Sequence, residues 1–365
     1  MAIHDLTLGF HTDAGLARVL DGANLRIAKG EVMGLVGESG CGKTTLARAV
    51  LGVLPQHQVE IERGEIVFNG RDLLKLDAAT LASEVRGRRI TFIPQDPYGS
   101  FNPVFTVGTQ IMEIMKWKSP RRRDEGLAGR LPPLLRPYPK AQRRADREKV
   151  MALLDAVQLP QPAQILRKYP GELSGGQRQR LMIAMALSCD PELLIADEPT
   201  TALDVTIQAQ ILELIKDLKA RMGTSVILIT HDLGVVAGMT DKIIVMYAGK
   251  VFEQAPTREL FSTPANPYTK GLLKSVPDPA HEQGTELYQI PGLPPDVAHL
   301  PTGCPFAERC YRVEDICREQ FPPFVQINEN HHSLCHFAEE VYADSKINPP
   351  TTARRNPIEG TITER

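Results

Sequence analysis

The chain has 365 residues, which is long for a single domain and suggests two or three. Its 42 basic and 44 acidic residues give a formal net charge of −2, so its overall charge does not favour nucleic acid as a partner. No run approaches the roughly 18–20 apolar residues that span a bilayer, and residues 1–5 do not begin a secretory signal. We therefore expect a soluble, cytosolic protein that contacts a membrane only through a partner.

In the first half of the chain, alternating apolar and polar residues predict strands over 3–10 and 20–27. A short buried strand over 31–36 runs into a glycine-rich loop, and a helix over 42–54 follows. Further strands are expected over 65–68 and 89–93. From 106 to about 190 the pattern is helical.

In the second half, an apolar strand over 193–196 precedes a helix over 205–222 and a buried strand over 225–229. Residues 242–253 are typical of a hairpin that turns at Ala248-Gly249. Strands that alternate with helices and end in glycine loops predict an α/β fold. Ligands then bind at the carboxyl ends of its strands.

Three segments differ in composition from the rest. Residues 118–148 are rich in Arg and Pro, which indicates either a solvated insertion loop or a basic patch for anionic lipid headgroups. Residues 262–300 hold many prolines and are expected to form a linker. Residues 346–365 are polar and are expected to form a disordered tail.

The sequence from Gly37 to Thr44 matches the phosphate-loop pattern in full, after a strand and before a helix. Its glycines let backbone N–H groups approach phosphates, Lys43 reaches the β and γ oxygens, and the Thr44 hydroxyl coordinates Mg²⁺. Cys41 contributes only its backbone. The residues predicted to contact ATP here are Gly37, Glu38, Ser39, Gly40, Cys41, Gly42, Lys43, Thr44 and Thr45.

Polar residues follow three other predicted strands. Asp197 and Glu198 end an apolar strand, where Asp197 fits Mg²⁺ binding through water and Glu198 fits a general base or water positioner. Gln95 and His231 each follow a buried strand. An amide suits Mg²⁺ and water, and a histidine suits the γ-phosphate, although either residue alone could be incidental.

Together these features resemble the nucleotide-binding subunit of ATP-binding-cassette (ABC) transporters over about residues 1–261. In that family Ser174-Gly175-Gly176-Gln177 is the signature sequence, and Ala202-Leu203-Asp204 is the D-loop. Gln95 falls on the Q-loop and His231 on the switch histidine. Phe10 falls where the family carries an aromatic residue that stacks on adenine, with a core role as the alternative.

The resemblance implies a RecA-like core with an antiparallel β subdomain and a helical subdomain at about 106–190. It assigns catalytic roles to Lys43, Gln95, Glu198 and His231, and it assigns Mg²⁺ to Thr44, Gln95 and Asp197. It also implies a head-to-tail dimer in which the phosphate loop of one subunit faces Ser174–Gln177 and Asp204 of the other.

This chain has one cassette, so the resemblance implies that a second ABC ATPase subunit completes a dimer, as a paralogue in a heterodimer. The expected further partners are two membrane permease subunits and an extracytoplasmic solute-binding protein, with no nucleic acid. The expected location is peripheral, on the cytoplasmic face of the bacterial inner membrane.

Beyond residue 261, Asn266-Pro267-Tyr268 and Gly303–Phe306 resemble the C-terminal extension of the oligopeptide and dipeptide importers, with Asn266 in place of the usual His. Residues 301–345 contain Cys304, Cys310, Cys317 and Cys335. Four clustered cysteines in a reducing compartment favour a metal site over disulfides, either tetrahedral zinc or an iron–sulfur cluster.

The spacing of the four cysteines is wider than in structural zinc sites. The resemblance implies a [4Fe–4S] cluster, with zinc or free thiols as alternatives. We expect His331, His332 and His336 to be solvated or to lie behind the ligands.

The expected function is ATP hydrolysis that energises import of dipeptides, oligopeptides or related solutes through dimer closure. Importers of nickel, glutathione or cationic peptides share the extension and remain alternatives. An ABC ATPase acting on DNA or ribosomes is a remote alternative, since such proteins usually carry two cassettes or long coiled coils. A passive scaffold subunit would not need Glu198 and His231.

Overall fold

The computed structural model describes residues 1–13, 15–55, 57–119, 136–200, 205–276, 288–348 and 350. The chain folds into two compact units, one of Met1–Lys75 with Ile227–Arg365 and one of Leu76–Val226. Within the described ranges, no helix is long and apolar enough to cross a membrane. Most of the expected tail and residues 120–135 of the expected insertion lie outside the described residues.

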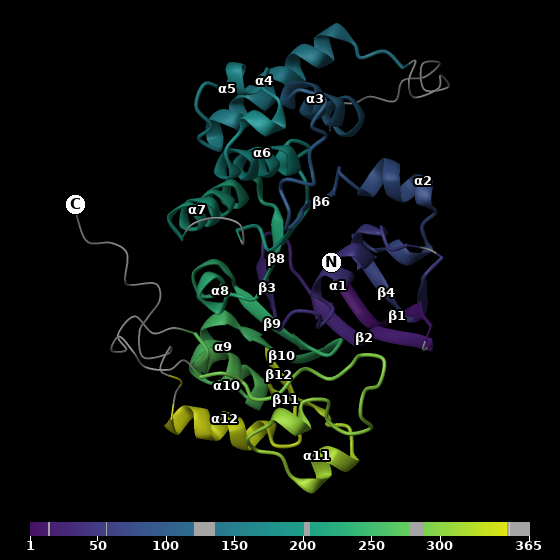
Figure 1. Cartoon of the computed structure of the whole chain (residues 1–365), viewed down its shortest axis with the longest axis vertical. Helices are drawn as coiled ribbons and strands as arrows, with labels where there is room; N and C mark the ends of the chain where they lie inside the picture. Colours follow the sequence, from purple (N-terminus) through teal and green to yellow (C-terminus); the bar gives the residue numbers. More distant parts are fainter. Residues whose placement is uncertain are drawn as a thin grey trace, which may run out of the picture. The chain divides into compact units, whose positions relative to one another are not determined.

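An antiparallel sheet forms the amino-terminal part of the first unit, with strand order β2-β1-β4-β5 (Figure 1). Its strands are β1 (Ala2–Thr12), β2 (Gly15–Arg26), β4 (Val59–Phe68) and β5 (Arg71–Asp72). β4 starts six residues before the expected strand because its polar first half pairs with the far end of β1, where Phe10 faces Val59. Pairing with a neighbour, rather than alternation of side chains, extends this strand.

A mixed sheet forms the rest of the first unit, with strand order β11-β12-β10-β9-β3-β8. Its strands are β3 (Val32–Val36), β8 (Ser225–Thr230), β9 (Lys242–Tyr247), β10 (Lys250–Pro256), β11 (Phe324–Asn328) and β12 (His331–Leu334). β3 is fully buried and pairs in parallel with β9. The hairpin β11–β12, which the sequence analysis did not predict, continues this sheet because Glu253 of β10 pairs with Ser333 of β12.

The helices of the first unit are α1 (Lys43–Leu51), α8 (Leu233–Met239), α9 (Thr257–Ser262), α10 (Pro267–Lys274), α11 (Asp315–Glu319) and α12 (Ala338–Ile347). α10 lies inside the segment expected to be a linker, and that interpretation is wrong for these residues. Pro267 occupies the first turn and the Asn266 side chain accepts the Tyr268 N–H, so the prolines here start a helix. The side chain of Tyr268 is fully buried.

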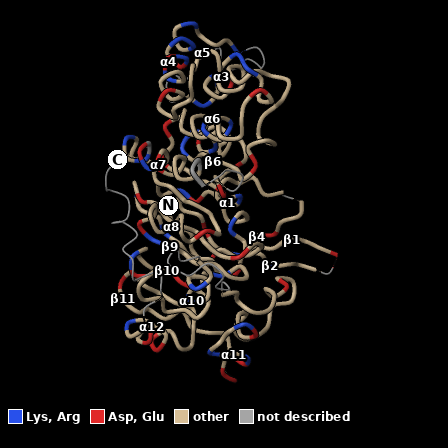
Figure 2. The backbone as a smooth tube through the Cα atoms, turned by 60° about the vertical axis from the view of Figure 1, so that its left-hand side comes forward, with Lys and Arg blue, Asp and Glu red and all other residues tan. Residues whose placement is uncertain are grey.

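The second unit contains the parallel strands β6 (Ile90–Ile93) and β7 (Leu193–Asp197). Its α-helices are α2 (Ala78–Thr80), α3 (Val107–Lys118), α4 (Lys140–Ala156), α5 (Pro162–Ile165), α6 (Gly175–Leu187) and α7 (Val205–Met222). α4 begins inside the expected insertion, directly after Pro139, and is supported by an Arg144–Glu148 ion pair at 3.0 Å. Basic and acidic residues are interspersed along the described chain (Figure 2).

Candidate functional site

The loop Gly37–Thr44 joins β3 to α1 in a conformation that depends on glycine. Gly37 and Gly42 have φ of 152° and 103°, a region that side chains rarely adopt. A Cβ on Gly37 would lie 2.2 Å from the carbonyl oxygen of Met246. Because α1 begins at Lys43 without a side-chain cap, its first N–H groups are suited to bind an anion.

The Lys43 side chain is buried within this loop, with 6% of its surface exposed. Its Nζ donates to the carbonyl oxygens of Gly37 at 2.8 Å and Glu38 at 2.9 Å. An ammonium group held by carbonyls can exchange these partners for phosphate oxygens. Burial raises the pKa of the adjacent Cys41 thiol, so this side chain packs as a neutral group.

In the second unit, the parallel pairing of β6 with β7 brings together the residues that follow the two strands. The Gln95 Nε2 donates to Glu198 Oε2 at 2.8 Å. Glu198 has a positive φ of 46°, a strained conformation of the kind found at functional sites. The Asp197 side chain ends β7 and is 3% exposed. Carboxylate and amide oxygens are suitable Mg²⁺ ligands, so the donor chemistry of Gln95 and Asp197 fits this ion.

The segment that resembles the family signature forms the start of α6. Ser174 Oγ accepts the Gln177 N–H at 3.3 Å, and Gln177 Oε1 accepts the Ser174 N–H at 3.1 Å, a reciprocal capping box. The guanidinium of Arg178 donates to the Leu173 carbonyl and lies 3.9 Å from the centre of the Tyr98 ring. The exposed Ser174 therefore lies on a rigid helix start that carries a positive partial charge.

The structure gives less information about the roles of three other residues predicted to lie in the site. His231 follows β8 and is exposed, directly before Asp232, which caps α8. Phe10 is half-buried on β1, so the structure does not decide between adenine stacking and a core role. Asp204 lies outside the described residues.

A groove of about 630 Å³ runs beside α3 in the second unit. The residues that line it are Ser100, Phe105, Thr109, Gln110, Glu113, Ile114, Trp117, Lys118 and Met185. Gln110 fixes the loop after Gln95, because its Nε2 donates to the carbonyl oxygens of Asn102 and Phe105, both at 2.9 Å. The side chains of Val104 and Phe105 are 73% and 51% exposed, so this loop carries exposed apolar surface.

The four clustered cysteines line one shared cavity in the first unit, with apolar neighbours that include Phe252, Pro267, Phe306 and Leu334. The Arg312 N–H donates to Cys310 Sγ and the Phe337 N–H donates to Cys335 Sγ, both at 3.4 Å. Such N–H donors stabilise sulfur that carries negative charge. The free volume of this cavity is about 20 Å³.

Among the described residues, no group of three or more His, Cys, Asp or Glu side chains is arranged to hold a metal ion. Burial raises the pKa of Cys304 to about 11 and that of Cys335 to about 12, and the charges of neighbouring thiols add to both shifts. The four thiols are thus near enough to influence one another. Their chemistry, though not their present spacing, fits a thiolate-bound metal group.

His331 is fully buried, so of its two expected roles, solvated or behind the ligands, the solvated one is wrong. Its Nε2 lies 2.7 Å from Glu253 Oε1 and its Nδ1 lies 3.0 Å from Glu259 Oε1. Burial alone would lower the pKa of His331, but the two carboxylates outweigh it and raise the pKa. His331 therefore joins β12 to β10 and α9. No local sequence pattern marks this role, because both carboxylates lie more than 70 positions away.

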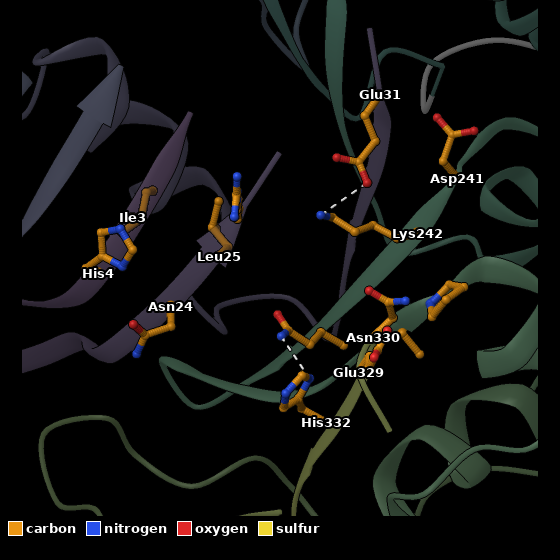
Figure 3. A pocket seen from close by; sticks show the side chains of 14 residues that line it. Ile3, His4, Asn24, Leu25, Glu31, Asp241, Lys242, Glu329, Asn330 and His332 are labelled. Carbon is orange, nitrogen blue, oxygen red and sulfur yellow. Dashed lines mark hydrogen bonds and ion pairs between the residues drawn. The ribbon is translucent and has the colours of Figure 1, made fainter. Parts of the chain in front are cut away.

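A separate pocket of about 450 Å³ in the first unit is lined by β1, β2, β9, β10 and the β11–β12 turn (Figure 3). The pocket contains a Lys242–Glu31 ion pair at 3.1 Å and a contact of 3.3 Å between Gln254 Nε2 and His332 Nδ1. Its polar groups therefore interact with one another. The residues predicted to bind nucleotide do not line it.

A glycine-rich phosphate loop at the start of a helix, and a Gln–carboxylate pair after two parallel strands, define a nucleotide-hydrolysing protein of the P-loop class. The family comparisons agree. Residues 20–201 match the family model described as ABC transporter, and residues 252–317 match the one described as oligopeptide/dipeptide transporter, C-terminal region.

Curated relatives cover nearly the whole chain. A probable peptide ABC transporter ATP-binding protein of Sinorhizobium fredii is 46% identical over 93% of this chain and 95% of its own length. The dipeptide transport ATP-binding protein DppD of Bacillus subtilis is 42% identical over 92% of this chain and 93% of its own length. The oligopeptide transport ATP-binding protein OppD of Salmonella typhimurium is 42% identical over 88% of this chain and 89% of its own length.

A solved structure of the ATP-binding cassette MJ0796 bound to ADP and phosphate is similar in fold. Its TM-score is 0.57 at 24% identity, over 70% of this chain and 98% of that one. The chain belongs to the ABC transporter family, as an ATP-hydrolysing subunit that carries the C-terminal region of the oligopeptide and dipeptide transporters. The family assignment of the sequence analysis is thereby confirmed.

Proposed function

We propose that this chain is the ATPase subunit that energises import of dipeptides or oligopeptides through a membrane permease. The observation that carries the proposal is the match of residues 252–317 to the C-terminal region of that transporter class, on a chain with relatives at 42–46% identity. The subunit would act peripherally at the cytoplasmic face of the inner membrane. Its partners would be two permeases, a solute-binding protein and a second ATPase subunit, which we propose to be a paralogue.

In the proposed reaction, water attacks the γ-phosphorus of ATP, the bond from that phosphorus to the β–γ bridging oxygen breaks, and ADP leaves with phosphate as the other product. Glu198 orients and polarises that water, and its hydrogen bond from Gln95 holds the carboxylate in place before nucleotide arrives. Lys43 and His231 stabilise negative charge on the transferring group. When bound, Mg²⁺ supplies further positive charge at the phosphate oxygens, and the residues that would hold it are Thr44, Gln95 and Asp197.

The signature segment would act on ATP held by the partner subunit. Ser174 supports this because it is exposed and lies on a helix start fixed by the capping box with Gln177. Asp204, in the D-loop, would contact the same interface. Dimer closure would then be required for hydrolysis.

Transmission to the permease would use the groove beside α3. The loop after Gln95 both starts at the hydrolytic pair and ends at the exposed Phe105, and Gln110 fastens it to α3. A movement of Gln95 during hydrolysis therefore reaches this apolar surface through one short, tied loop.

Reconstitution tests the proposed substrate. The chain, its permeases, its partner ATPase and the solute-binding protein are placed in vesicles, and ATP hydrolysis is measured with the binding protein loaded with a tripeptide, glutathione or nickel. We expect stimulation by the tripeptide. Stimulation by nickel or glutathione alone would replace the peptide assignment while leaving the ATPase assignment intact.

We also propose that Cys304, Cys310, Cys317 and Cys335 bind a [4Fe–4S] cluster rather than zinc. The support is that all four thiols line one largely apolar cavity, and four cysteine thiolates are the ligand set of such a cluster.

An anaerobic preparation tests the cluster. It should be brown and contain about four iron atoms per chain. Cys335→Ser should lose the iron, whereas Cys189→Ser, which changes a buried cysteine outside the cluster, should keep it. A colourless protein with one zinc would contradict the proposal.

A further inference from the structure

Glu38 of the phosphate loop is held from outside the loop by two residues of the C-terminal region. The guanidinium of Arg309 forms a bidentate ion pair with its carboxylate, with Nη1 donating to Oε2 at 2.6 Å and Nη2 donating to Oε1 at 2.8 Å. The Glu38 backbone N–H donates to the hydroxyl of Tyr268 at 3.0 Å. Its carbonyl accepts from Lys43 Nζ. Hydrogen bonds therefore hold all three groups of Glu38: its side chain, its backbone N–H and its carbonyl.

Arg309 is itself rigidly placed. Its side chain is 5% exposed, its Nε donates to the Pro291 carbonyl at 2.8 Å and its Nη1 also donates to the Tyr247 hydroxyl at 3.1 Å. The guanidinium lies 5.8 Å from the ring centre of Tyr247 and 5.9 Å from that of Phe306. A bidentate pair with a buried, fixed guanidinium sets the position of its partner more firmly than an exposed ion pair.

The backbone that carries Arg309 lies between two cysteines. Residues Ala307–Arg309 form one turn of 3-10 helix, closed by the Ala307 N–H donating to the Cys304 carbonyl and the Cys310 N–H donating to the Ala307 carbonyl. Phe306 and Ala307 form part of the wall of the cysteine cavity. The conformation of this short turn therefore determines where the guanidinium of Arg309 lies.

Tyr268 is placed by the same region. Asn266 Oδ1 accepts the Tyr268 N–H at 3.0 Å, while Asn266 Nδ2 donates to the carbonyl oxygens of Phe252 and Leu334, both at 3.1 Å. Asn266 also lines the cysteine cavity. The two groups that hold Glu38 thus depend on separate parts of the cavity wall.

Electrostatics makes this arrangement relevant to nucleotide binding. A carboxylate in a phosphate loop repels the phosphates that the loop binds, and the repulsion is large where solvent screens it poorly. Arg309 neutralises this charge and holds the carboxylate, while Lys43 Nζ donates to the backbone carbonyls of Gly37 and Glu38 and to the Cys41 sulfur. Without Arg309, the Glu38 carboxylate would keep its charge and lose its anchor.

We propose that Arg309 is a positioning residue for the phosphate loop, acting through Glu38, so that the cysteine-rich extension sets the affinity of its own subunit for ATP. The proposal rests on the proposed nucleotide site at Gly37–Thr45. Tyr268 acts in the same direction through the backbone N–H.

The test measures MgATP binding to the full-length chain by calorimetry and the KM and kcat for ATP in the assembled transporter. Arg309→Gln should raise Kd and KM about tenfold and leave kcat within about twofold. Introducing Glu38→Gln into the Arg309→Gln variant should recover most of the loss, because the unneutralised carboxylate is removed. Arg309→Lys keeps the positive charge but cannot form both hydrogen bonds of the guanidinium, so its Kd should lie between those of wild type and Arg309→Gln.

Arg318→Gln is the matched control, since Arg318 pairs with Glu308 in the same extension but both side chains are exposed. It should change Kd less than about twofold. Tyr268→Phe, which removes only the hydroxyl, should raise Kd about threefold. If Arg309→Gln fails to fold, this variant tests whether the C-terminal region sets the affinity for ATP.

Unchanged ATP binding in Arg309→Gln, with binding abolished in Lys43→Ala, would overturn the proposal and leave the nucleotide site intact. A loss that Glu38→Gln does not repair would also overturn it, since Arg309 would then act through the fold alone. If Lys43→Ala binds ATP normally, the nucleotide site at the phosphate loop and this proposal both fail.

Discussion

The phosphate loop and the cysteine-rich extension are both tightly held, but by contacts of different range. In the phosphate loop, Lys43 Nζ donates to carbonyl oxygens five and six residues away. The loop glycines supply backbone conformations with positive φ. The extension depends on pairs such as His331 with Glu253, 78 residues apart, and Arg309 with Glu38, 271 residues apart. A change in the loop should therefore act directly on nucleotide, whereas a change in the extension should act through residues that are distant in sequence, as Arg309 acts through Glu38.

The largest effect is expected within the loop. Gly37→Ala would place a Cβ 2.2 Å from the Met246 carbonyl oxygen at a φ of 152°, so the loop must move. We expect the affinity for MgATP to fall by about 100-fold or more in calorimetry. Gly171→Ala is the control, because nothing lies within 4 Å of its added Cβ. Similar losses in both variants would show that the geometry of Gly37 is not the cause.

A second effect is expected where the extension joins the sheet. Asn266→Ala would leave buried carbonyl oxygens of Phe252 and Leu334 without this donor and would uncap α10. The cost should be about 2–3 kcal/mol of local stability. Hydrogen exchange in α10 and β12 should show it, while exchange in β6 and β7 stays unchanged. Loss of protection throughout the chain would contradict the division into separately stabilised regions.

These first two sites differ in how far the sequence predicts them. The phosphate loop, β3, α1 and β7 follow from short motifs and apolar runs, because the physics that shapes them acts over a few neighbouring residues. Gln95 and Glu198 were identified as strand-end residues, and the structure adds their direct hydrogen bond.

The extension was predicted less well. The many prolines of residues 262–300 predict a linker, whereas Pro267 begins the helix α10. The hairpin β11–β12 is short and gains its stability from pairing with β10. The roles of Arg309 and His331 depend on partners in other segments, and no local pattern in a single sequence marks such pairs.

A pH-dependent effect should distinguish the buried His331 cluster from the loop. The raised pKa of His331 means that its ion pairs stabilise the fold below about pH 6.5 and lose this contribution as pH rises through the folded pKa. Burial tends to raise the pKa of Glu259, but hydrogen bonds from His331 and Asn328 outweigh it and lower this pKa. The contribution of Glu259 to stability is therefore present above about pH 4.3 and is lost as pH falls through its lowered pKa in the folded protein.

Protection of β12 from hydrogen exchange should accordingly be greatest between about pH 4.3 and 6.5 and weaken above this window. His331→Gln should lower local stability by about 3 kcal/mol, because two carboxylates lose a buried charged partner. It should also flatten the pH dependence. A flat profile in the wild-type chain would contradict the assignment of His331 as the titrating group.

The smallest effect is expected for the exposed ion pair between Arg318 and Glu308, whose nitrogen and oxygen lie 3.4 Å apart. Arg318→Gln should leave the melting temperature within the error of the measurement, because solvent screens such pairs. A clear decrease in the melting temperature would mean that exposed ion pairs also stabilise the extension. Arg309 would then not differ in kind from the exposed charges.

We propose that ATP bound by this chain is hydrolysed with Glu198 as the residue that polarises the attacking water. The most direct test compares ATP turnover and ATP binding in the assembled transporter for Glu198→Gln, with Glu192→Gln, an exposed carboxylate paired with Arg89, as control. Glu198→Gln should lower turnover about 100-fold with ATP binding retained, and Glu192→Gln should change neither. Unchanged turnover in Glu198→Gln would rule out this role of Glu198.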